Sequence, residues 1–387
     1  MFTLSEEQLA VRDAARSFAQ QELRPGVVDR DREMQHPTEL VKKMGQLGFM
    51  GMTTDPAWEG GGMDFLSYVL ALEEIAAVDA SAAVIMSVNN SLVCWGLQKY
   101  GSEELKEKYL RKLAPGHWIG AFCLSEPEAG SDATHQRTTA TPQGDSYLLN
   151  GTKNWITNGA TSDVHLVIAQ SDPAKAHRGI NAFVVESSWP GVEIGSKEDK
   201  MGIRSSDTTS ITYTNVKVPK ENLLGTDGLG FRLAMETLAG GRIGIAAQAL
   251  GIAKGAYERS LAYAKQREAF GKPIAKHQAI GFKLADMVTE IEAARLLVYQ
   301  AAQLKDHGHD YQLAGSMAKR YAADIAMKHT TEAVQIHGGY GYVREYEVER
   351  MMRDAKITQI YEGTSEIQQL VIARNIIKGQ LYPPVLI

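Results

Sequence analysis

The amino-acid sequence has few cysteines and no strong excess of charge of either sign. Its 387 residues include only two cysteines, Cys94 and Cys123, which form no CxxC pair. Two such thiols suit a reduced compartment, although the spacing leaves a disulfide between them open. The formal net charge of -5, with no long basic block, argues against binding to nucleic acid or to an anionic membrane. We therefore expect a soluble metabolic protein.

Several chemical motifs are also missing. The stretch "GLGFRL" has Leu233 where a dinucleotide-binding loop would carry its third glycine, and no GxxxxGK[ST] phosphate loop exists. There is no GxSxG elbow for hydrolase chemistry, and "HGHD" at 307–310 is typical of a solvated loop, so we expect no metal site. No run looks long and apolar enough to span a membrane. The start of the chain carries a capping box, Ser5 to Gln8, which favours a folded helix over a targeting peptide.

What the sequence does contain is a change of periodicity along its length. Residues 1–119 are mostly helical in pattern, as in "SEELKEKYLRKL". Residues 120–229 hold extended runs, and Asn150-Gly151 predicts a hairpin turn between two of them. Residues 230–387 return to a helical period typical of an antiparallel bundle. The expected architecture is thus α+β and multidomain, with an N-terminal helical domain, a central β-barrel-like domain and a C-terminal helical bundle.

A lone acid near the end of the chain is the first candidate for chemistry. In "QIYEGTSEIQQLVIAR" (359–374), Ser365 and Gln368 have the spacing of a capping box, so a helix should begin near Ser365. Glu362 then lies just before the cap, and Gly363 permits a backbone that holds its side chain away from the helix axis. The plain alternative is a solvated acid that favours the positive end of the helix.

Five polar, glycine-containing stretches carry a family resemblance when they are read together. They are "FCLSEPEAGSDA" (122–133), "NWITNG" (154–159), "REAFGKPIAKHQ" (267–278), "QIHGGYGY" (335–342) and "IYEGTSE" (360–366). In this order and spacing the sequence closely resembles the acyl-CoA dehydrogenase family over essentially its whole length. It is nearest to the short-chain, butyryl-CoA type through "SVNNSLV" and "GGRIGIAAQALGIA".

The resemblance implies an FAD cofactor held between the β-domain and the C-terminal helices. It implies cofactor contacts from two sets of residues, one of which would reach the FAD of a neighbouring subunit in a homotetramer. The first set comprises Phe122, Leu124, Ser125, Ser131, Trp155, Ile156, Thr157, Thr364 and Glu366. The second comprises Arg267, Phe270, Gln278, Gln335, Gly338 and Gly339.

The resemblance also implies roles for the substrate and the reaction. Glu362 matches the family's catalytic glutamate, while an alternative base position on a nearby helix holds Gly241 and no acid. The implied acyl-CoA contacts are Ser131, Gly241, Arg242, Tyr361 and Gly363. Arg242 has the plain alternative of a helix salt bridge. Ala239 stands where short-chain relatives commonly carry an aspartate, and His337 stands where relatives often have an apolar residue.

The function that the resemblance implies is FAD-dependent dehydrogenation of a short acyl-CoA to its trans-2-enoyl-CoA, with electrons passed to an electron-transferring flavoprotein. The alternatives are a branched or dicarboxyl acyl-CoA substrate, or operation in the direction of enoyl-CoA reduction. A helical interaction protein that keeps the fold without the cofactor is the rival from another class. The implied location is the bacterial cytoplasm, or the mitochondrial matrix for a processed eukaryotic form.

Overall fold

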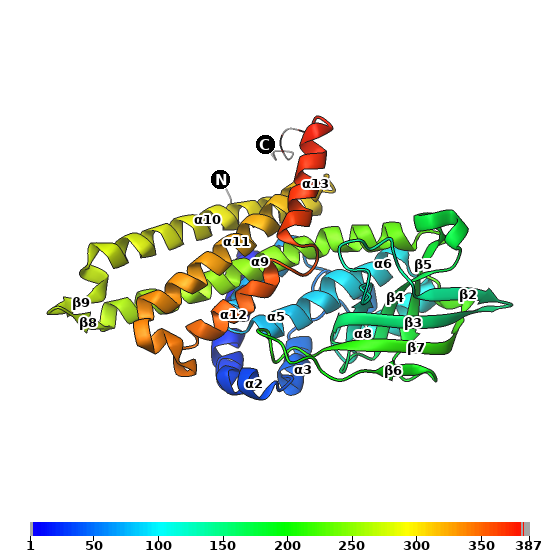
Figure 1. Ribbon diagram of the computed structural model, residues 1–387, viewed down its shortest axis with the longest axis horizontal. Helices are drawn as coiled ribbons and strands as arrows, with labels where there is room; N and C mark the ends of the chain where they lie inside the picture. Colours follow the sequence, from blue (N-terminus) through cyan, green and yellow to red (C-terminus); the bar gives the residue numbers. More distant parts are fainter. Residues whose placement is uncertain (1–2, 381, 383–387) are drawn as a thin grey trace.

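Helices make up the first part of the chain in the computed structural model, which describes residues 3–380 and residue 382 (Figure 1). Helix α1 begins after the capping box between Ser5 and Gln8, as the sequence predicts. Three π-helical turns, at 19–23, 88–94 and 106–110, interrupt or join the helices. The α-helices of this part are α1 (Glu6–Phe18), α2 (Val27–Glu33), α3 (Thr38–Gln46), α4 (Phe65–Ala76), α5 (Ala80–Ser87), α6 (Trp95–Tyr100), α7 (Glu103–Leu105) and α8 (Arg111–Leu113).

One segment here corrects an expectation from the sequence. The continuous helical stretch Ala80–Tyr100 is long and apolar enough, with a mean hydropathy of 1.3, to pass the length and composition test for a membrane span. However, 94% of that apolar window is buried inside the protein, where it packs as a core helix. Its Cys94 and the distant Cys123 are both buried free thiols, so they do not form the disulfide that the sequence left open.

A curled sheet follows, with the strand order β1-β4-β2-β3-β7-β6 and β5 paired with β4. The prediction of a turn at Asn150-Gly151 is wrong, because both residues lie inside β3. They form a bulge against β7, in which the Asn150 side chain accepts a hydrogen bond from the Asn215 backbone at 2.8 Å. The strands are β1 (Gly120–Cys123), β2 (Thr139–Gln143), β3 (Ser146–Thr157), β4 (Val164–Gln170), β5 (Ile180–Glu186), β6 (Val192–Ile194) and β7 (Thr208–Pro219).

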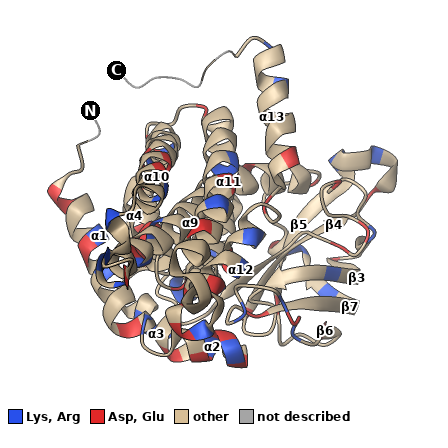
Figure 2. Cartoon of the chain, turned by 60° about the vertical axis from the view of Figure 1, so that its left-hand side comes forward, with Lys and Arg blue, Asp and Glu red and all other residues tan. Residues whose placement is uncertain are grey.

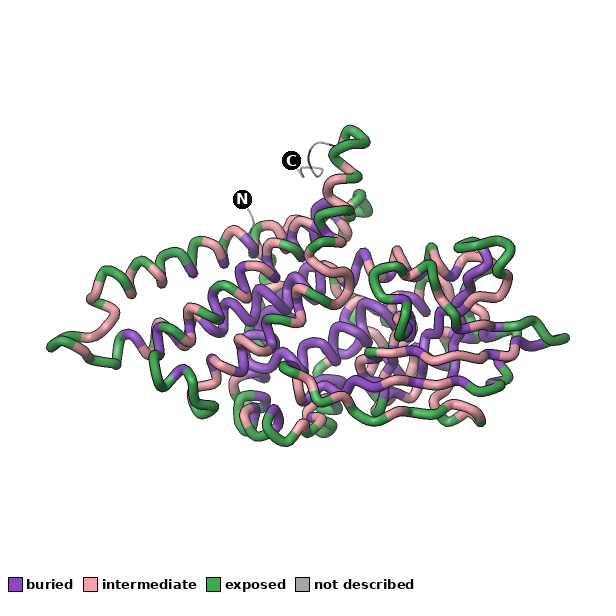
Figure 3. Tube along the Cα trace, in the orientation of Figure 1, coloured by how far each residue is buried: buried purple, intermediate pink, exposed green. Residues whose placement is uncertain are grey.

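The last part of the chain is a bundle built around one long helix, α9, which runs beside both the N-terminal helices and the sheet (Figure 1). Its central section is buried on every side (Figure 3), whereas α13 projects from the body and is largely exposed. The order of helices, strands and helices is therefore confirmed. The elements are α9 (Gly230–Gln266), β8 (Glu268–Ala269), β9 (Lys272–Pro273), α10 (Gln278–Asp306), α11 (Gln312–His337), α12 (Val348–Thr358) and α13 (Ser365–Ile377).

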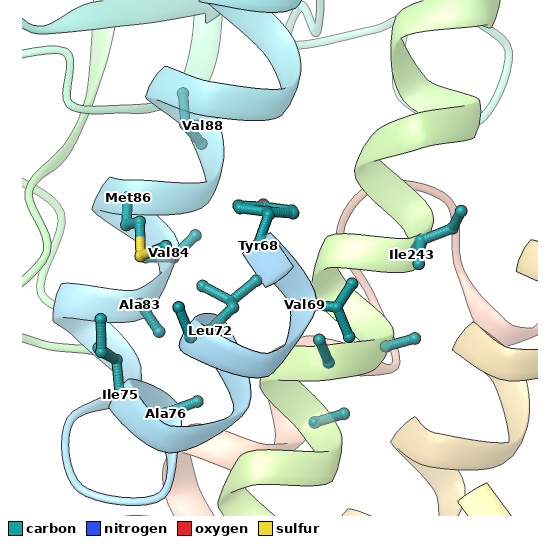
Figure 4. Packing of buried hydrophobic residues seen from close by; sticks show 14 of the residues in the cluster. Tyr68, Val69, Leu72, Ile75, Ala76, Ala83, Val84, Met86, Val88 and Ile243 are labelled. Atoms are coloured by element: carbon teal, nitrogen blue, oxygen red, sulfur yellow. The ribbon is translucent and has the colours of Figure 1, made fainter. Parts of the chain in front are cut away.

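The core lies where α4, α5 and α9 meet (Figure 4). Leu72 of α4 points toward α5, which carries Val84 and Met86, whereas Val69 points toward α9, which carries Ile243, and all five side chains are buried. Such burial of aliphatic side chains is the main stabilising term, at roughly 1.5–3 kcal/mol for each fully buried side chain. This packing fixes α9 against the N-terminal helices.

Glycines on α9 permit its close approach to α4. A Cβ atom at Gly251 would overlap the Glu73 carbonyl oxygen and would lie 2.7 Å from Ala76 Cβ. One turn further, a Cβ at Gly255 would lie 2.9 Å from the Ala77 carbonyl carbon. The backbones therefore touch at positions where no other residue fits.

Buried ion pairs join the same helices. Lys254 of α9 lies 2.5 Å from Glu74 of α4, and Arg295 of α10 lies 2.8 Å from Glu73. The Tyr299 hydroxyl also donates to Glu73 at 3.0 Å, so these acids have partners on both neighbouring helices. In the view of Figure 2 the other charged residues are scattered over the helices, with both signs intermingled.

We predict that Gly251→Ala lowers the stability of the protein by about 1–3 kcal/mol, because the added methyl group must push α9 away from α4. Gly281→Ala on α10 is the matched control, since the nearest atom to its added Cβ is 3.9 Å away. That control should be neutral or stabilising by up to about 1 kcal/mol through helix propensity. Chemical denaturation of both variants makes the comparison, and equal effects would contradict the close-packing argument.

Candidate active site

The candidate acid, Glu362, lies on a tight turn between α12 and α13. Its backbone has φ +51°, and Gly363 follows with φ +93°. Helix α13 begins at Ser365 as predicted, but its cap is Thr364, whose side chain accepts a hydrogen bond from the Ile367 backbone at 3.2 Å. The predicted capping box of Ser365 with Gln368 is therefore wrong. The turn already supplies a cap one residue earlier, which leaves the Gln368 side chain free for other contacts.

The Glu362 carboxylate points from this turn toward helix α9. Its Oε2 atom is buried and has no hydrogen-bond partner among the residues that the structure describes. A Cβ at Gly241 would overlap this atom and would lie 2.8 Å from a Leu92 methyl group. Glu362 is thus not the solvated acid of the plain alternative, and glycine at position 241 makes the room for its carboxylate.

Two cations face the carboxylate from neighbouring helices. Arg242 of α9 and Lys319 of α11 both act electrostatically on Glu362. Burial raises the pKa of Glu362 to about 7, because it removes water from the charged form, and the two cations only partly oppose this effect. Burial lowers the pKa of Lys319 to about 8 for the converse reason. At neutral pH this carboxyl group is therefore poised between its two protonation states.

The wall around the carboxylate combines hydroxyl groups with small residues. Tyr361 donates a hydrogen bond to Gln248 of α9, and Tyr68 of α4 donates to Ser87 of α5 at 3.0 Å. A Cβ at Gly244 would lie 2.8 Å from the Tyr68 hydroxyl oxygen and 2.9 Å from that of Ser87. Gly241 and Gly244 thus form a bare face of α9, without side chains, that extends from the Glu362 carboxylate to these two hydroxyl groups.

Arg242 is the other substrate candidate on α9. Its Nε atom is buried without a hydrogen-bond partner among the described residues, which does not fit the plain alternative of a helix salt bridge. Burial lowers the pKa of Arg242 in spite of the nearby Glu362. Ala239 lies one turn before Ile243 on the same helix, and both of these side chains are buried.

The candidates in the β-domain gather at the ends of two strands. Phe122 lies in β1, Leu124 and Ser125 follow it, and the Ser125 carbonyl accepts a hydrogen bond from the Asn154 backbone at 2.9 Å. This bond brings the segment that follows β1 beside the end of β3, where Trp155 has φ +60° and is 61% exposed. Nearby in sequence, Ile156 is buried, Thr157 pairs with β7, and Ser131 is exposed.

A third group of candidate residues lies at the end of the molecule that is opposite the sheet. Arg267 and Phe270 belong to the β8–β9 hairpin, which Figure 1 shows far from the sheet. Phe270 is 95% exposed at φ +52°, and Gln278 begins α10 and is exposed. One chain therefore does not bring this group together with Glu362 or with the β-domain candidates.

A cavity of about 570 Å³ adjoins this third group. Its lining includes Arg267 and, at the end of α11, His337, Gly338 and Gly339. Nothing lies within 4 Å of a Cβ added at either glycine, so the backbone is open to an approaching group. His337 stacks on Tyr263 with ring centroids 4.3 Å apart. Gln335 precedes this turn on α11, while Thr364 and the exposed Glu366 remain at the start of α13.

Sequence reasoning missed two residues beside the acid. The Lys319 Nζ atom donates to the Gly363 carbonyl oxygen at 2.7 Å, and the Gln368 side chain donates to the same oxygen at 2.9 Å. Both residues are fully buried. A lysine inside a helix gives no local signal of this contact, whereas the spacing of Gln368 predicts a capping role that the structure does not show.

The chain belongs to the acyl-CoA dehydrogenase family. Its residues 5–117, 121–216 and 228–377 match the family's N-terminal, middle and C-terminal domain models in turn. The family is one of FAD-dependent oxidoreductases, and the chain is an enzyme of this class.

Individual relatives cover almost the whole chain. A short-chain specific acyl-CoA dehydrogenase from Clostridium acetobutylicum is 48% identical over 97% of this chain and 100% of its own length. A 3-(aryl)acrylate reductase from Clostridium sporogenes is 47% identical, over 98% and 100%.

Solved structures agree closely with this fold. The butyryl-CoA dehydrogenase of Megasphaera elsdenii matches with a TM-score of 0.96 and 48% identity, over 97% of this chain and 100% of that one. A chain from a structure of the electron transferring flavoprotein of Acidaminococcus fermentans matches with a TM-score of 0.97 and 49% identity, over 98% and 100%.

We predict that Glu362→Gln stabilises the folded protein at alkaline pH. The folded-state pKa of about 7 lies above the ordinary 4.5, so the folded state binds this proton more tightly than the unfolded state. Ionised Glu362 therefore costs stability as pH rises between these values, and the full cost applies above them. The variant should gain about 1–3 kcal/mol near pH 8 and much less near pH 5. Denaturant unfolding at both pH values measures this, and an equal difference at the two would contradict the burial argument.

Proposed function

We propose that the chain converts a short-chain acyl-CoA to its trans-2-enoyl-CoA, with Glu362 as the base that removes the α-proton. The observation that carries this is the buried Glu362 Oε2 atom, which lacks a partner among the described residues and is held against the bare face of α9 at Gly241. The names of the short-chain and butyryl-CoA relatives support the short acyl chain. Relatives from bacteria and a mitochondrial relative from Mus musculus support a place in the bacterial cytoplasm or the mitochondrial matrix.

The geometry suits proton abstraction from a weakly acidic carbon. A carboxylate with few hydrogen bonds and little water around it is a stronger base than one in solution, and its pKa of about 7 matches a neutral operating pH. Gly241 leaves space beside the carboxylate, and Gly363 and Tyr361 flank it along the chain. Arg242 and Ser131 complete the proposed acyl-CoA contacts. Bound FAD supplies a hydride acceptor for the β-carbon.

The residues of the β-domain and of α13 fit a planar, hydrogen-bonding cofactor. Trp155 presents a large exposed ring at the end of β3, beside the backbone of Ser125. Hydrogen bonds from such a site tune a flavin, which is the protein's contribution to the chemistry of the bound group. The proposed FAD contacts from these elements are Phe122, Leu124, Ser125, Ser131, Trp155, Ile156, Thr157, Thr364 and Glu366.

The remaining FAD contacts would come from a neighbouring subunit. The cavity beside Arg267 offers a guanidinium group and two open glycines, Gly338 and Gly339, which suit a phosphate-bearing group. Phe270, Gln278 and Gln335 would complete this set. Since the cavity and the β-domain lie at opposite ends of one chain, the proposal includes assembly as a homotetramer. Exposed apolar residues on α10 and α13, including Phe282, Leu296, Leu370 and Ile377, support such assembly.

The electron acceptor in this proposal is an electron-transferring flavoprotein, supported by the similarity to a chain from the Acidaminococcus fermentans flavoprotein structure. The reverse reaction is the second candidate function, because a relative of similar identity is named as an acrylate reductase. Both directions use the same proton at the α-carbon, so Glu362 would serve either. The direction is decided by comparing rates with acyl-CoA and with enoyl-CoA under matched conditions.

We predict that Glu362→Gln retains FAD and acyl-CoA binding but loses flavin reduction by substrate. Positioned acid–base catalysis typically contributes about 10²- to 10⁴-fold, and this weakly acidic proton should place the loss at the upper end. The measurement is anaerobic flavin bleaching on addition of butyryl-CoA, longer straight-chain acyl-CoAs and branched acyl-CoAs. Wild type should bleach fastest with a short chain. A variant that bleaches at a rate near wild type would remove Glu362 as the base.

We predict that Arg267→Ala weakens FAD retention by roughly 1.5–3 kcal/mol, because a charge-assisted contact with the cofactor is lost. Lys272→Ala on the same hairpin is the control, since that cation is also exposed but lies outside the cavity lining. Dissociation of FAD is followed by the recovery of flavin fluorescence on dilution. Equal FAD affinity in the Arg267 variant and wild type would refute this assignment.

A further inference from the structure

The turn that carries Glu362 is not a conformation that the chain favours by itself. A glutamate at φ +51° lies in the left-handed region, which is strained for residues other than glycine. Gly363 at φ +93° extends the unusual conformation by a second residue. Contacts from the surrounding structure must therefore hold the turn in place.

Two buried donors from different helices meet on this turn. Lys319 of α11 donates to the Gly363 carbonyl oxygen at 2.7 Å, and Gln368 of α13 donates to the same oxygen at 2.9 Å. The Gln368 amide also lies 3.4 Å from the Glu362 carbonyl oxygen. A Cβ at Gly363 would lie 2.6 Å from the Gln368 nitrogen, so the amide packs directly on the turn. The bonds at 2.7 and 2.9 Å fix the peptide group between Gly363 and Thr364, and the Gln368 contact at 3.4 Å reaches the peptide group that follows Glu362.

The start of the turn is also held by α11. Asp324 accepts a hydrogen bond from the Gln359 side chain at 2.9 Å, and the Gln359 carbonyl accepts one from the Ser365 backbone at 2.9 Å. Helix α11 therefore contacts both ends of the segment 359–365. The turn has a fixed position relative to this helix.

The charges that face Glu362 come from two helices. Lys319 lies on α11 and Arg242 on α9, while the Tyr68 hydroxyl on α4 and the adjacent Tyr361 are uncharged near neutral pH, and burial raises the pKa of both further. Two further acids, Asp324 of α11 and Glu366 of α13, also favour the charged form of Lys319. Arg242 belongs to the proposed substrate contacts, so Lys319 is the facing cation that is also bonded to the turn itself.

We propose that Lys319 and Gln368 are positioning residues for Glu362, and that Lys319 has the additional role of stabilising its ionised carboxylate. Both residues hold the Gly363 carbonyl, so each keeps the carboxylate directed toward Gly241. Only Lys319 carries charge. This inference rests on the proposed role of Glu362 as the base. It separates the positioning of the carboxylate from the stabilisation of its charge, which a substitution of Glu362 itself cannot separate.

The test compares a loss of charge with a loss of a neutral bond. Lys319→Gln removes the cation and keeps a donor, and it should shift the midpoint of the pH dependence of flavin reduction upward by about one unit. The rate below the midpoint should therefore fall about tenfold, and Lys319→Arg should restore the wild-type midpoint. Gln368→Leu should lower the rate of flavin reduction by the same factor at every pH, so the midpoint of its pH dependence should not change.

Each of these results can overturn part of the proposal. A wild-type midpoint in Lys319→Gln would remove the electrostatic role, and a wild-type rate in Gln368→Leu would remove the positioning role. Folding and FAD content of each variant are checked by the flavin absorption band. If Lys319→Gln does not fold, Lys319→Met supplies the same loss of charge with a different volume.

A second measurement does not depend on catalysis. Infrared titration of the holoenzyme follows the stretch of the protonated carboxyl group, and Glu362→Gln identifies the band by removing it. Lys319→Gln should raise the pH at which this band disappears, whereas Gln368→Leu should not. Should wild type show no flavin reduction with any acyl-CoA, the proposed function fails, yet an unchanged band in Lys319→Gln would still refute the role of Lys319.

Discussion

The surrounding structure is arranged around one carboxylate whose inner oxygen has no hydrogen-bond partner among the described residues. Glu362 Oε2 is buried against α9, and the charges of Arg242 and Lys319 only partly offset the effect of that burial. A buried charge of this kind is costly, and it persists only where the fold holds it from several directions. The glycines of α9, the hydrogen bonds to the turn and the dense core between α4 and α9 all serve that requirement.

Much of the architecture follows from the sequence because periodicity depends on local geometry. Residues 230–387 have the helical period that predicts a bundle, and Leu284, Met287 and Ile291 are buried on α10 at spacings of three and four residues. The extended runs predicted within residues 120–229 include β4 and β5, which are buried along most of their length. The start of α13 at Ser365 could also be predicted, since cap residues and an apolar stripe coincide there.

The errors have a common physical cause, which is competition from other partners in the folded chain. Asn150-Gly151 has the composition of a turn, but pairing with β7 retains it inside a strand as a bulge. Gln368 has the spacing of a capping residue, yet the part-buried carbonyl of Gly363, five residues earlier, accepts the hydrogen bond of its amide. Segment 80–100 has the length and composition of a membrane span because a helix surrounded by the protein core, like one in a membrane, is kept from water on all sides. Local rules fail where a tertiary partner offers a better interaction.

The glycines of α9 also bear on how the protein folds. This helix of 37 residues contains six glycines, at 230, 240, 241, 244, 251 and 255, and each lowers the intrinsic stability of an isolated helix by about 1 kcal/mol relative to alanine. Such a segment has little tendency to form a helix in the unfolded chain, so its helical structure must arise together with its docking on α4. The same residues that open space for the carboxylate thus delay the formation of the longest helix. In folding terms, the site cannot be assembled before the core that surrounds it.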